Sequence, residues 1–327
     1  MKNRDKTRSY SYCLKTMKPD AGFLWGLFHH ADFLLAKILY PGLDGLDYFL
    51  YRYYENGYKV NKTFITEGDL AVMVRAFNGD QNSRNWARVN DKKHFNSEFP
   101  EYIGRKWIGD EASKEEFSVF CKATGKLIIK PTGGSQGRGV FFAVPETNED
   151  IEALYDKVHG QHYIIEEVIN EHQKLSALHP QSVNTLRLYT TRSLKDGIVR
   201  VTGAVIRIGR GDSGIDNYSS GGMVAEIDTD SGIVISRAVD EAGREYLKQP
   251  DTGIDIKGFE VPQWDEVKKK VLEAHEKVKD LNYIAWDVVV RDDDSIAFLE
   301  ANLYGGVHMQ QQPSMTGKKE LYRGMLP

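Results

Sequence analysis

Two acidic residues lie on facing segments of a hairpin that the sequence predicts near its C-terminus. The segments 285–291 and 296–302 are rich in branched and aromatic residues, which is typical of strands, and the polar turn between them contains the aspartates 292–294, which we expect to be solvated. If the residues that flank the turn pair with each other, Asp287 lies directly opposite Glu300. Like charges in this arrangement destabilise a sheet, so the pair indicates a binding function.

The same register pairs Arg291 with Ile296 and Val289 with Phe298, and it places Asn302 on the face of the two carboxylates. Two carboxylates and an amide oxygen on one patch suit Mg²⁺, which prefers oxygen ligands and usually shares them with substrate phosphates. These three side chains are therefore the predicted metal ligands. The alternative is a register shifted by one residue, in which one carboxylate points to solvent.

A glycine-rich segment, Thr132–Gly139, separates two further predicted strands, 126–130 and 140–144. It opens no helix and lacks the Gly-Lys-Ser/Thr ending of a Walker loop, so neither a Walker site nor a dinucleotide fingerprint fits. A hairpin tip that is dense in backbone N–H groups suits the oxygens of a triphosphate, although an ordinary glycine-rich turn is the alternative. The residues predicted to bind a nucleotide here are Lys130, Gly133, Gly134, Ser135, Gln136, Gly137 and Arg138.

One arginine, Arg187, lies within another predicted strand, 184–191. An arginine in a half-buried strand needs an anionic partner, and a phosphate would supply one through bidentate hydrogen bonds. A structural ion pair is the alternative.

Predicted helices must position these strands. The segment 113–124 begins with a Ser/Glu capping box and is followed by a glycine, and 148–159 has apolar residues on one face. With the strand expected at 163–167, the order helix, hairpin, helix, strand predicts a compact lid. A helix over 264–281 has valines at helical spacing and is expected to face the core.

Taken in order, these motifs resemble the ATP-grasp superfamily, and within it the sugar-transfer-associated ATP-grasp family. The resemblance covers roughly residues 85–315. It is carried by the segments 90–95, 129–139, 163–169, 182–187, 216–222 and 300–302.

The resemblance implies an α+β fold of the ATP-grasp type, in which two α+β subdomains clamp ATP beneath the glycine-rich hairpin. A mainly helical N-terminal region with a linker is expected over 1–110. The lid subdomain is expected over 111–167, and the C-terminal subdomain with the metal and substrate sites over 168–327.

The resemblance also implies roles for particular residues. Lys92, Lys130 and Arg187 would neutralise the phosphoryl group during its transfer, and of these Lys130 and Arg187 are the candidate catalytic residues. Lys93 is the alternative to Lys92.

A hinge between lid and base is expected where the strand at 163–167 ends. There, backbone groups would read the adenine edge, and an acidic side chain would bind the exocyclic amine or the ribose. The nucleotide-binding residues expected here are Glu166, Glu167 and Val168. Alternation along a strand sends the two glutamates to opposite faces, so one of them is expected to face the nucleotide, and the sequence leaves open which.

A stretch rich in Gly, Ser and Asp, 206–222, is long enough to form a mobile substrate loop. It is the expected place for recognition of the acceptor or the carboxylate, and a merely solvated loop is the alternative. The residues predicted to bind substrate are Asn184, Arg207, Arg210, Asp216, Asn217, Gly221 and Gly222.

The reaction follows from the resemblance. It implies a carboxylate–amine ligase with ATP and Mg²⁺ as cofactors, which forms an acyl phosphate and ADP before an amine attacks. The family's association with surface polysaccharides suggests that an amino acid or small acid is joined to an amino sugar or a uronic acid. A kinase acting on a stable acceptor and a non-catalytic ATP-binding module are the alternatives. The complete set of metal ligands argues against the module, because a degenerate site usually loses a ligand.

Composition fits a soluble enzyme. The chain has 327 residues, 41% hydrophobic and 28% charged, with a net charge of −4 that gives no reason to expect nucleic-acid binding. Its two cysteines, Cys13 and Cys121, form neither a disulfide framework nor a metal motif, and Cys121 is expected to pack in the core. A cytoplasmic location is expected, and no secretion signal is visible among the first twenty residues.

The segment 22–54 is apolar but interrupted by charged residues and a proline, so no membrane-spanning helix is expected. The favoured interpretation is a helical hairpin that packs onto the ATP-binding domains. The alternative is an interfacial helix that makes peripheral contact with a membrane, which Trp25, the clustered aromatic residues and Lys37 would permit.

Overall fold

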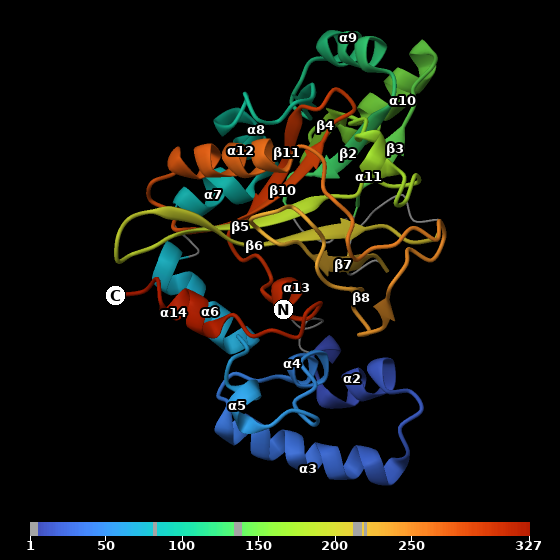
Figure 1. Cartoon of the computed structure of the whole chain (residues 1–327). Helices are drawn as coiled ribbons and strands as arrows, with labels where there is room; N and C mark the ends of the chain where they lie inside the picture. The colour runs from blue at the N-terminus through green and yellow to red at the C-terminus, as the bar shows by residue number, and fades with distance from the viewer. Residues whose placement is uncertain (1–5, 81–83, 134–138, 212–217, 219–220) are drawn as a thin grey trace.

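Two antiparallel sheets and a cluster of N-terminal helices make up the fold. The computed structural model describes residues 6–80, 84–133, 139–211, 218 and 221–327. Figure 1 shows the smaller sheet at one end of the molecule, the larger sheet in the middle and the N-terminal helices at the opposite end.

The larger sheet, here called the base sheet, contains seven strands in the order β11-β10-β5-β6-β7-β8-β9. Nearly every side chain of β5 and β10 is buried, because helices cover both faces, and such strands read as continuous apolar runs. The strands are β5 (Leu186–Arg192), β6 (Val199–Ile208), β7 (Met223–Glu226), β8 (Ala238–Asp240), β9 (Glu245–Tyr246), β10 (Tyr283–Val290) and β11 (Ile296–Asn302).

Helices pack on the base sheet through apolar residues at helical spacing. Val267, Val271 and Ala274 of α12 are buried, and this helix contacts β5, β6 and β10. It ends at Glu276, before the predicted end at Leu281. The helices around this sheet are α6 (Glu67–Asn78), α7 (Arg84–Asn90), α8 (Lys92–Glu98), α11 (Gln173–Ser176), α12 (Trp264–Glu276), α13 (His308–Gln311) and α14 (Lys319–Arg323).

The smaller sheet, here called the lid sheet, has the strand order β1-β4-β2-β3. Two helices pack against it and enclose a hydrophobic cluster of its own, which includes Cys121 as predicted. The capping box of Ser113 and Glu116 is confirmed, and Gly125 ends that helix with a positive φ of 75°. The lid elements are β1 (Trp107–Gly109), α9 (Lys114–Thr124), β2 (Leu127–Pro131), β3 (Phe141–Ala143), α10 (Asn148–Val158) and β4 (Tyr163–Glu167).

The N-terminal helices enclose a separate aromatic core. Tyr10, Phe33, Tyr48 and Phe49 meet there, apart from the cores of the two sheets. The prediction of a helical hairpin packed onto the ATP-binding domains is wrong for α3, because this helix packs on α2 and α4 and turns its other face to solvent. The helices are α2 (Tyr10–Met17), α3 (Phe23–Leu39), α4 (Gly45–Leu50) and α5 (Tyr58–Asn61).

Packing divides the first 110 residues between all three parts of the molecule. Residues of α6, α7 and α8 belong to the core of the base sheet, and β1 belongs to the lid sheet. The predicted division of the chain into three parts, with boundaries at residues 110 and 167, stays a prediction. None of the helices in the described part of the chain is long and apolar enough to cross a membrane.

Candidate active site

The hairpin of β10 and β11 places Asp287 opposite Glu300, as predicted. The strand pairs between the turn and Asp287 differ from the predicted ones. Next to the turn, Val290 pairs with Ile296, so the predicted pairing of Arg291 with Ile296 is wrong. The three aspartates of the turn are exposed, as expected.

A bulge restores the register that brings the two carboxylates together. Val289 pairs with Ala297, so its predicted pairing with Phe298 is also wrong. Phe298 and Glu300 pair with consecutive residues of β10, which makes Leu299 the extra residue of a β-bulge. Bulges often occur next to active sites, where they redirect a side chain.

Glu300 lies at the centre of a small polar group. Its Oε1 accepts a hydrogen bond from Asn302 Nδ2 at 3.2 Å, and its Oε2 lies 3.8 Å from Lys92 Nζ. The Glu300 side chain is 34% exposed, so solvent or a ligand can reach it.

The donor set of Asp287, Glu300 and Asn302 fits the chemistry of Mg²⁺. It offers two carboxylates and an amide, and the amide nitrogen of Asn302 already donates to Glu300, so the amide oxygen is the atom that would serve a cation. Among the described residues, no cluster of three acidic, histidine or cysteine side chains exists that could hold a metal. A site here would therefore depend on the amide and on ligands from a substrate.

Asp287 is clasped by two arginines from neighbouring strands. Arg187 donates from Nε to Oδ1 and from Nη2 to Oδ2, both at 2.6 Å, and Arg207 Nη1 donates to Oδ2 at 2.9 Å. Burial of the Asp287 carboxyl acts to raise its pKa, but the charges of both arginines outweigh burial and lower the pKa below the ordinary value. Asp287 is therefore ionised, and the ion pair that was the alternative for Arg187 is present.

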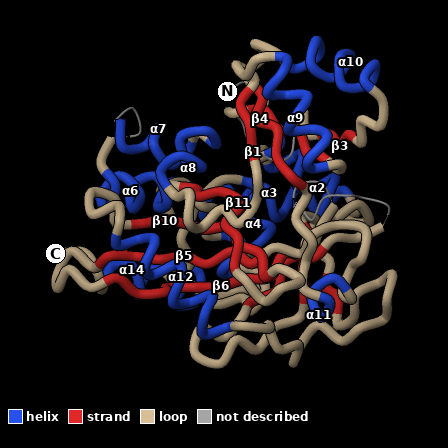
Figure 2. Tube along the Cα trace, turned by 90° about the horizontal axis from the view of Figure 1, so that it is seen from above, coloured by secondary structure: helices blue, strands red, loops and turns tan. Residues whose placement is uncertain are grey.

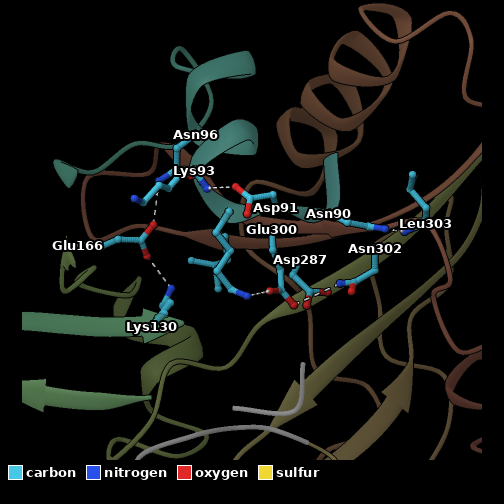
Figure 3. A network of polar contacts seen from close by, with 12 residues as sticks. Asn90, Asp91, Lys93, Asn96, Lys130, Glu166, Asp287, Glu300, Asn302 and Leu303 are labelled. Atoms are coloured by element: carbon cyan, nitrogen blue, oxygen red, sulfur yellow. Dashed lines mark hydrogen bonds and ion pairs between the residues drawn. The ribbon is translucent and has the colours of Figure 1, made fainter. Parts of the chain in front are cut away.

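The lid sheet contributes a second buried ionic group. Lys130 Nζ donates to Glu166 Oε2 at 2.6 Å, and Glu166 Oε1 accepts from Arg105 Nη2 at 2.6 Å and from Asn96 Nδ2 at 2.9 Å. Burial acts to raise the pKa of Glu166, but the charges of Arg105 and Lys130 lower it well below the usual range. Figure 3 shows Glu166 and Lys130 on one side of the start of α8, and the group of Asp287 and Asn302 on the other.

Arg105 joins the lid sheet to the bulge in β11. Besides Glu166, it binds the carbonyl oxygen of Phe298 through Nη1 at 2.6 Å and that of Leu299 through Nη2 at 3.3 Å. Neither Arg105 nor Asn96 was predicted from the sequence. Glu166, Phe298 and Leu299, which they contact, lie 61 to 194 residues away in the sequence, so no local pattern reveals this network.

Lys92 and Lys93 have different partners at the start of α8, a helix whose N-terminus is capped by Asp91. The backbone N–H of Lys92 donates to the carbonyl of Thr132 at 3.3 Å, at the root of the glycine-rich segment, while its side chain faces Glu300. Lys93 instead pairs with Asp110 and Glu111.

The segment that the sequence predicts as a hinge lies at the end of β4. Glu166 is buried and Glu167 is half-exposed on the opposite face, where its Oε2 accepts from the backbone of Lys106 at 3.1 Å. The backbone N–H of Val168 donates to the carbonyl of Lys126 at 3.3 Å.

Part of the predicted nucleotide site lies outside the described residues. Gly133 is described and exposed. The predicted residues that are not described are Gly134, Ser135, Gln136, Gly137 and Arg138.

The predicted substrate residues fall into separate places. Asn184 is fully buried, and its side chain contacts Glu171 and the carbonyls of Leu175, His179 and Ser182. These contacts order the loop before β5. The prediction that Asn184 contacts substrate stays a prediction.

Arg210 lies near the far end of the base sheet. Its Nη1 donates to Asp240 Oδ2 at 3.1 Å, and its guanidinium lies 5.2 Å from the centre of the Tyr246 ring. Gly221 has a positive φ of 97°, and Gly222 is buried before β7. The remaining predicted substrate residues, Asp216 and Asn217, lie outside the described residues.

The arrangement is suited to holding a polyanion. Lys92, Arg187 and Arg207 contact the two carboxylates, and Lys130 lies across from them on the lid sheet. Cations held in place by acidic partners can stabilise phosphate oxygens without reorganisation during a reaction. Figure 2, viewed from above, shows β10 and β11 beside α7 and α8, next to the lid sheet.

Comparison with known proteins gives one family match. The model for the sugar-transfer-associated ATP-grasp family matches residues 72–322, which is most of the chain. None of the curated proteins matches the sequence.

Solved structures with a similar fold are distant. The ATP-grasp ligase PsnB in complex with a minimal precursor is 16% identical, with 76% of this chain and 63% of that chain covered and a TM-score of 0.46. PsnB with a phosphomimetic variant of its precursor, Mg and ADP is 15% identical, with 72% and 56% covered and a TM-score of 0.43. D-alanyl-alanine synthetase A from Vibrio cholerae is 10% identical, with 74% and 60% covered and a TM-score of 0.42. The chain thus spans less than two thirds of each of these proteins, and likenesses this weak carry no information about substrates.

Proposed function

Because this chain belongs to the sugar-transfer-associated ATP-grasp family, we propose that it is an ADP-forming ligase that activates a carboxylate with ATP and joins it to an amine. The observation that supports this most is the facing pair of Asp287 and Glu300, with Lys92, Arg187 and Arg207 in contact with it. Burying ion pairs carries a desolvation cost that can exceed their attraction, so a cluster of them beside a partly exposed carboxylate favours a ligand-binding role over a stabilising one.

Within this proposal, Glu300 and Asn302 would hold Mg²⁺ together with Asp287. The metal, when bound, would neutralise charge on the β- and γ-phosphates. Arg187 and Arg207 fix the carboxylate of Asp287 in its ionised form, because their charges lower its pKa.

The cations around the metal ligands act on the phosphates. Lys92 lies between the root of the glycine-rich segment and Glu300, where its ammonium can contact phosphate oxygens. Lys130 approaches from the lid sheet and is held by Glu166. Closure of the lid over the nucleotide would exclude water and protect the activated acid from hydrolysis.

The proposed reaction has two steps. A carboxylate oxygen attacks the γ-phosphorus, the bond between that phosphorus and the bridging oxygen breaks, and ADP leaves. The amine nitrogen then attacks the acyl carbon, the carbon–oxygen bond to phosphate breaks, and the amine loses a proton as the amide and phosphate form. Binding and charge neutralisation supply the catalysis, so no nucleophilic side chain is needed.

The substrate class is a further part of the proposal. We propose that an amino acid or small acid is joined to a sugar of a surface polysaccharide or its precursor. If the sugar is an amino sugar, the acid is the activated carboxylate and the sugar supplies the amine. If the sugar is a uronic acid, its carboxylate is activated and the amino acid supplies the amine. This substrate class is proposed from the family alone. Arg210, together with the loop before β7, is the proposed place where the substrate is recognised.

The test is ADP formation from Mg²⁺·ATP with pools of small carboxylates, with hydroxylamine present as a trap. The proposal predicts ADP that depends on one carboxylate, together with the hydroxamate of that acid. ADP without hydroxamate, with phosphate found on a stable acceptor, would establish a kinase instead. ATP binding without turnover across acids and amines would indicate a non-catalytic module.

A further inference from the structure

Helix α3 presents an apolar face to solvent. Phe28 retains 70% of its accessible surface and Leu35 55%, although both are large apolar residues. A contiguous apolar face of this extent marks an interaction site on a soluble protein. The exposed large apolar residues of α3 are Phe23, Leu24, Leu27, Phe28, Leu34, Leu35, Ile38 and Leu39.

The opposite face of α3 is already used. Gly26, Phe33 and Ala36 are buried, and Phe33 stacks on Tyr10 and meets the edge of Tyr48. Only the outer face is therefore available to a partner. Seventeen residues give this helix a length of about 25 Å along that face.

The position of α3 allows contact with a flat surface. Figure 1 shows it as the outermost element at the end of the molecule away from α9 and the lid sheet, with its axis running across that end. A planar partner can therefore touch the whole helix without meeting the base sheet first.

Charge on this part of the chain favours an anionic partner. Residues 1–66 contain ten lysines and arginines against six aspartates and glutamates, whereas residues 67–327 contain 33 against 41. Within α3, which the structure describes in full, no acidic side chain belongs to the exposed face. Asp32 is half-buried and accepts a hydrogen bond from the Tyr48 hydroxyl at 2.6 Å, while Lys37 is exposed.

The same face offers little to a protein partner. Protein interfaces combine apolar contacts with about one hydrogen bond per 100–200 Å². Among the exposed residues of α3, only His30 and Lys37 carry polar side-chain atoms. A bilayer needs no such hydrogen bonds from the buried face.

Aromatic and basic residues flank the face at its N-terminal end. A hollow of about 530 Å³ opens there, lined in part by Lys18, Trp25 and Tyr54, with Asp20 and Glu55 also at its wall. The rings of Trp25 and Tyr54 meet edge to face, and Lys18 Nζ lies 5.3 Å from the centre of the Tyr54 ring. Tryptophan and tyrosine favour the depth of lipid headgroups.

We propose that the outer face of α3 docks on a bilayer surface that carries anionic headgroups. The helix lies in the plane of the interface, with its apolar side chains among the upper acyl chains and Lys37 at the headgroups. This orientation turns the lid sheet and the predicted ATP site away from the bilayer. The inference does not depend on the reaction proposed above.

The test is flotation of the full chain with vesicles of phosphatidylcholine alone and with vesicles that also contain about 30 mol % phosphatidylglycerol, whose anionic headgroups give the surface a negative potential. The wild type should bind the anionic vesicles, and added salt should weaken the binding. The double substitution Phe28→Glu with Leu35→Glu should reduce the bound fraction about tenfold or more, because it places two charges in the apolar layer. Unfolding midpoints report whether this variant folds.

A matched control carries Val72→Glu and Val119→Glu, which change two exposed apolar residues of α6 and α9 and add the same charge. It should bind vesicles like the wild type. The alternative is that a second copy of the chain covers the outer face of α3. Light scattering of each protein measures its molar mass in solution and thus detects such a dimer. The proposal is overturned if the wild type does not float with anionic vesicles, if both double variants float equally well, or if the α3 variant only converts a dimer to a monomer.

Discussion

Arg187 and Asp287 face each other across β5 and β10 and share two parallel hydrogen bonds of 2.6 Å. The sequence predicted one as a catalytic cation and the other as a metal ligand, and the structure joins them in one buried pair. Each thus holds the other in its charged form, since the charge of Asp287 raises the pKa of Arg187 against the effect of burial.

Replacement of Arg187 by lysine should test this paired geometry. Lysine keeps the charge but cannot make two parallel hydrogen bonds, so we expect the free energy of unfolding to fall by about 1.5–3 kcal/mol. Urea unfolding measures the change. Arg200→Lys is the control, because Arg200 pairs with Asp196 at the surface of the same sheet and its loss should leave the unfolding midpoint unchanged. Equal urea unfolding midpoints for both variants would show that the two parallel hydrogen bonds of Arg187 add no stability.

Lys92 and Lys93 provide a test from adjacent residues. Lys92→Met should weaken ATP binding about tenfold, or about 1.4 kcal/mol, because its side chain lies at Glu300 and the root of the glycine-rich segment. Lys93→Met should change the affinity little, because Lys93 is bound to Asp110 and Glu111. Calorimetric titration of ATP with Mg²⁺ measures both. A larger loss in the Lys93 variant would reverse our assignment.

Glu166 should control the acid stability of the lid. Its folded pKa is lowered, so the stability it contributes is present above its ordinary pKa of about 4.3 and is lost as the pH falls further. Glu166→Gln should cost about 3–5 kcal/mol at pH 7, because Lys130 and Arg105 lose their common anion. The difference from wild type should shrink below pH 4.

The control for Glu166 is its neighbour. Glu167→Gln removes a half-exposed carboxylate that accepts a hydrogen bond from the backbone of Lys106, and this variant should unfold like the wild type at every pH. If the two variants lose equal stability, the buried network is not the cause.

His275 predicts a second pH dependence. Burial lowers its pKa from 6.5 to about 3, and its ring is held neutral between the Thr190 hydroxyl at 2.6 Å and the carbonyl of Leu281 at 2.9 Å. The unfolded chain therefore binds a proton that the folded chain excludes, and stability falls as the pH decreases from about 6.5, by at most about 1.4 kcal/mol per pH unit.

His275→Gln keeps one donor and one acceptor without a titrating ring, so its unfolding free energy should vary less between pH 7 and 5 than that of the wild type. His94→Gln, which changes an exposed histidine, is the control. If the unfolding free energy of His275→Gln decreased between pH 7 and 5 as steeply as that of the wild type, His275 would not be the cause of the pH dependence.

Local signals in the sequence predicted the elements well. The capping box at Ser113, the strand Tyr163–Glu167 and the two strands around the glycine-rich segment depend on residues close in sequence, and the structure confirms them. The predicted α+β fold of the ATP-grasp type is confirmed by the family match and the two sheets.

Long-range relationships were beyond the sequence. Turn residues alone do not reveal the bulge at Leu299. The correct pairing of Asp287 with Glu300 was therefore predicted from a register whose strand pairs nearer the turn do not form. Nothing local marks Arg105 as the residue that joins the lid to β11. In α3, apolar residues occur on both faces, so the sequence could not tell which face would meet the protein.

The most direct test of the account is calorimetric titration of ATP into wild type and Glu300→Gln, with Mg²⁺ and with EDTA. We predict one ATP site whose affinity depends on Mg²⁺ and falls about tenfold or more in Glu300→Gln. Asp292→Asn, in the exposed turn of the same hairpin, should bind like the wild type. Binding that is indifferent to Mg²⁺ and equal in all three proteins would contradict the assignment of Asp287, Glu300 and Asn302 as the metal site.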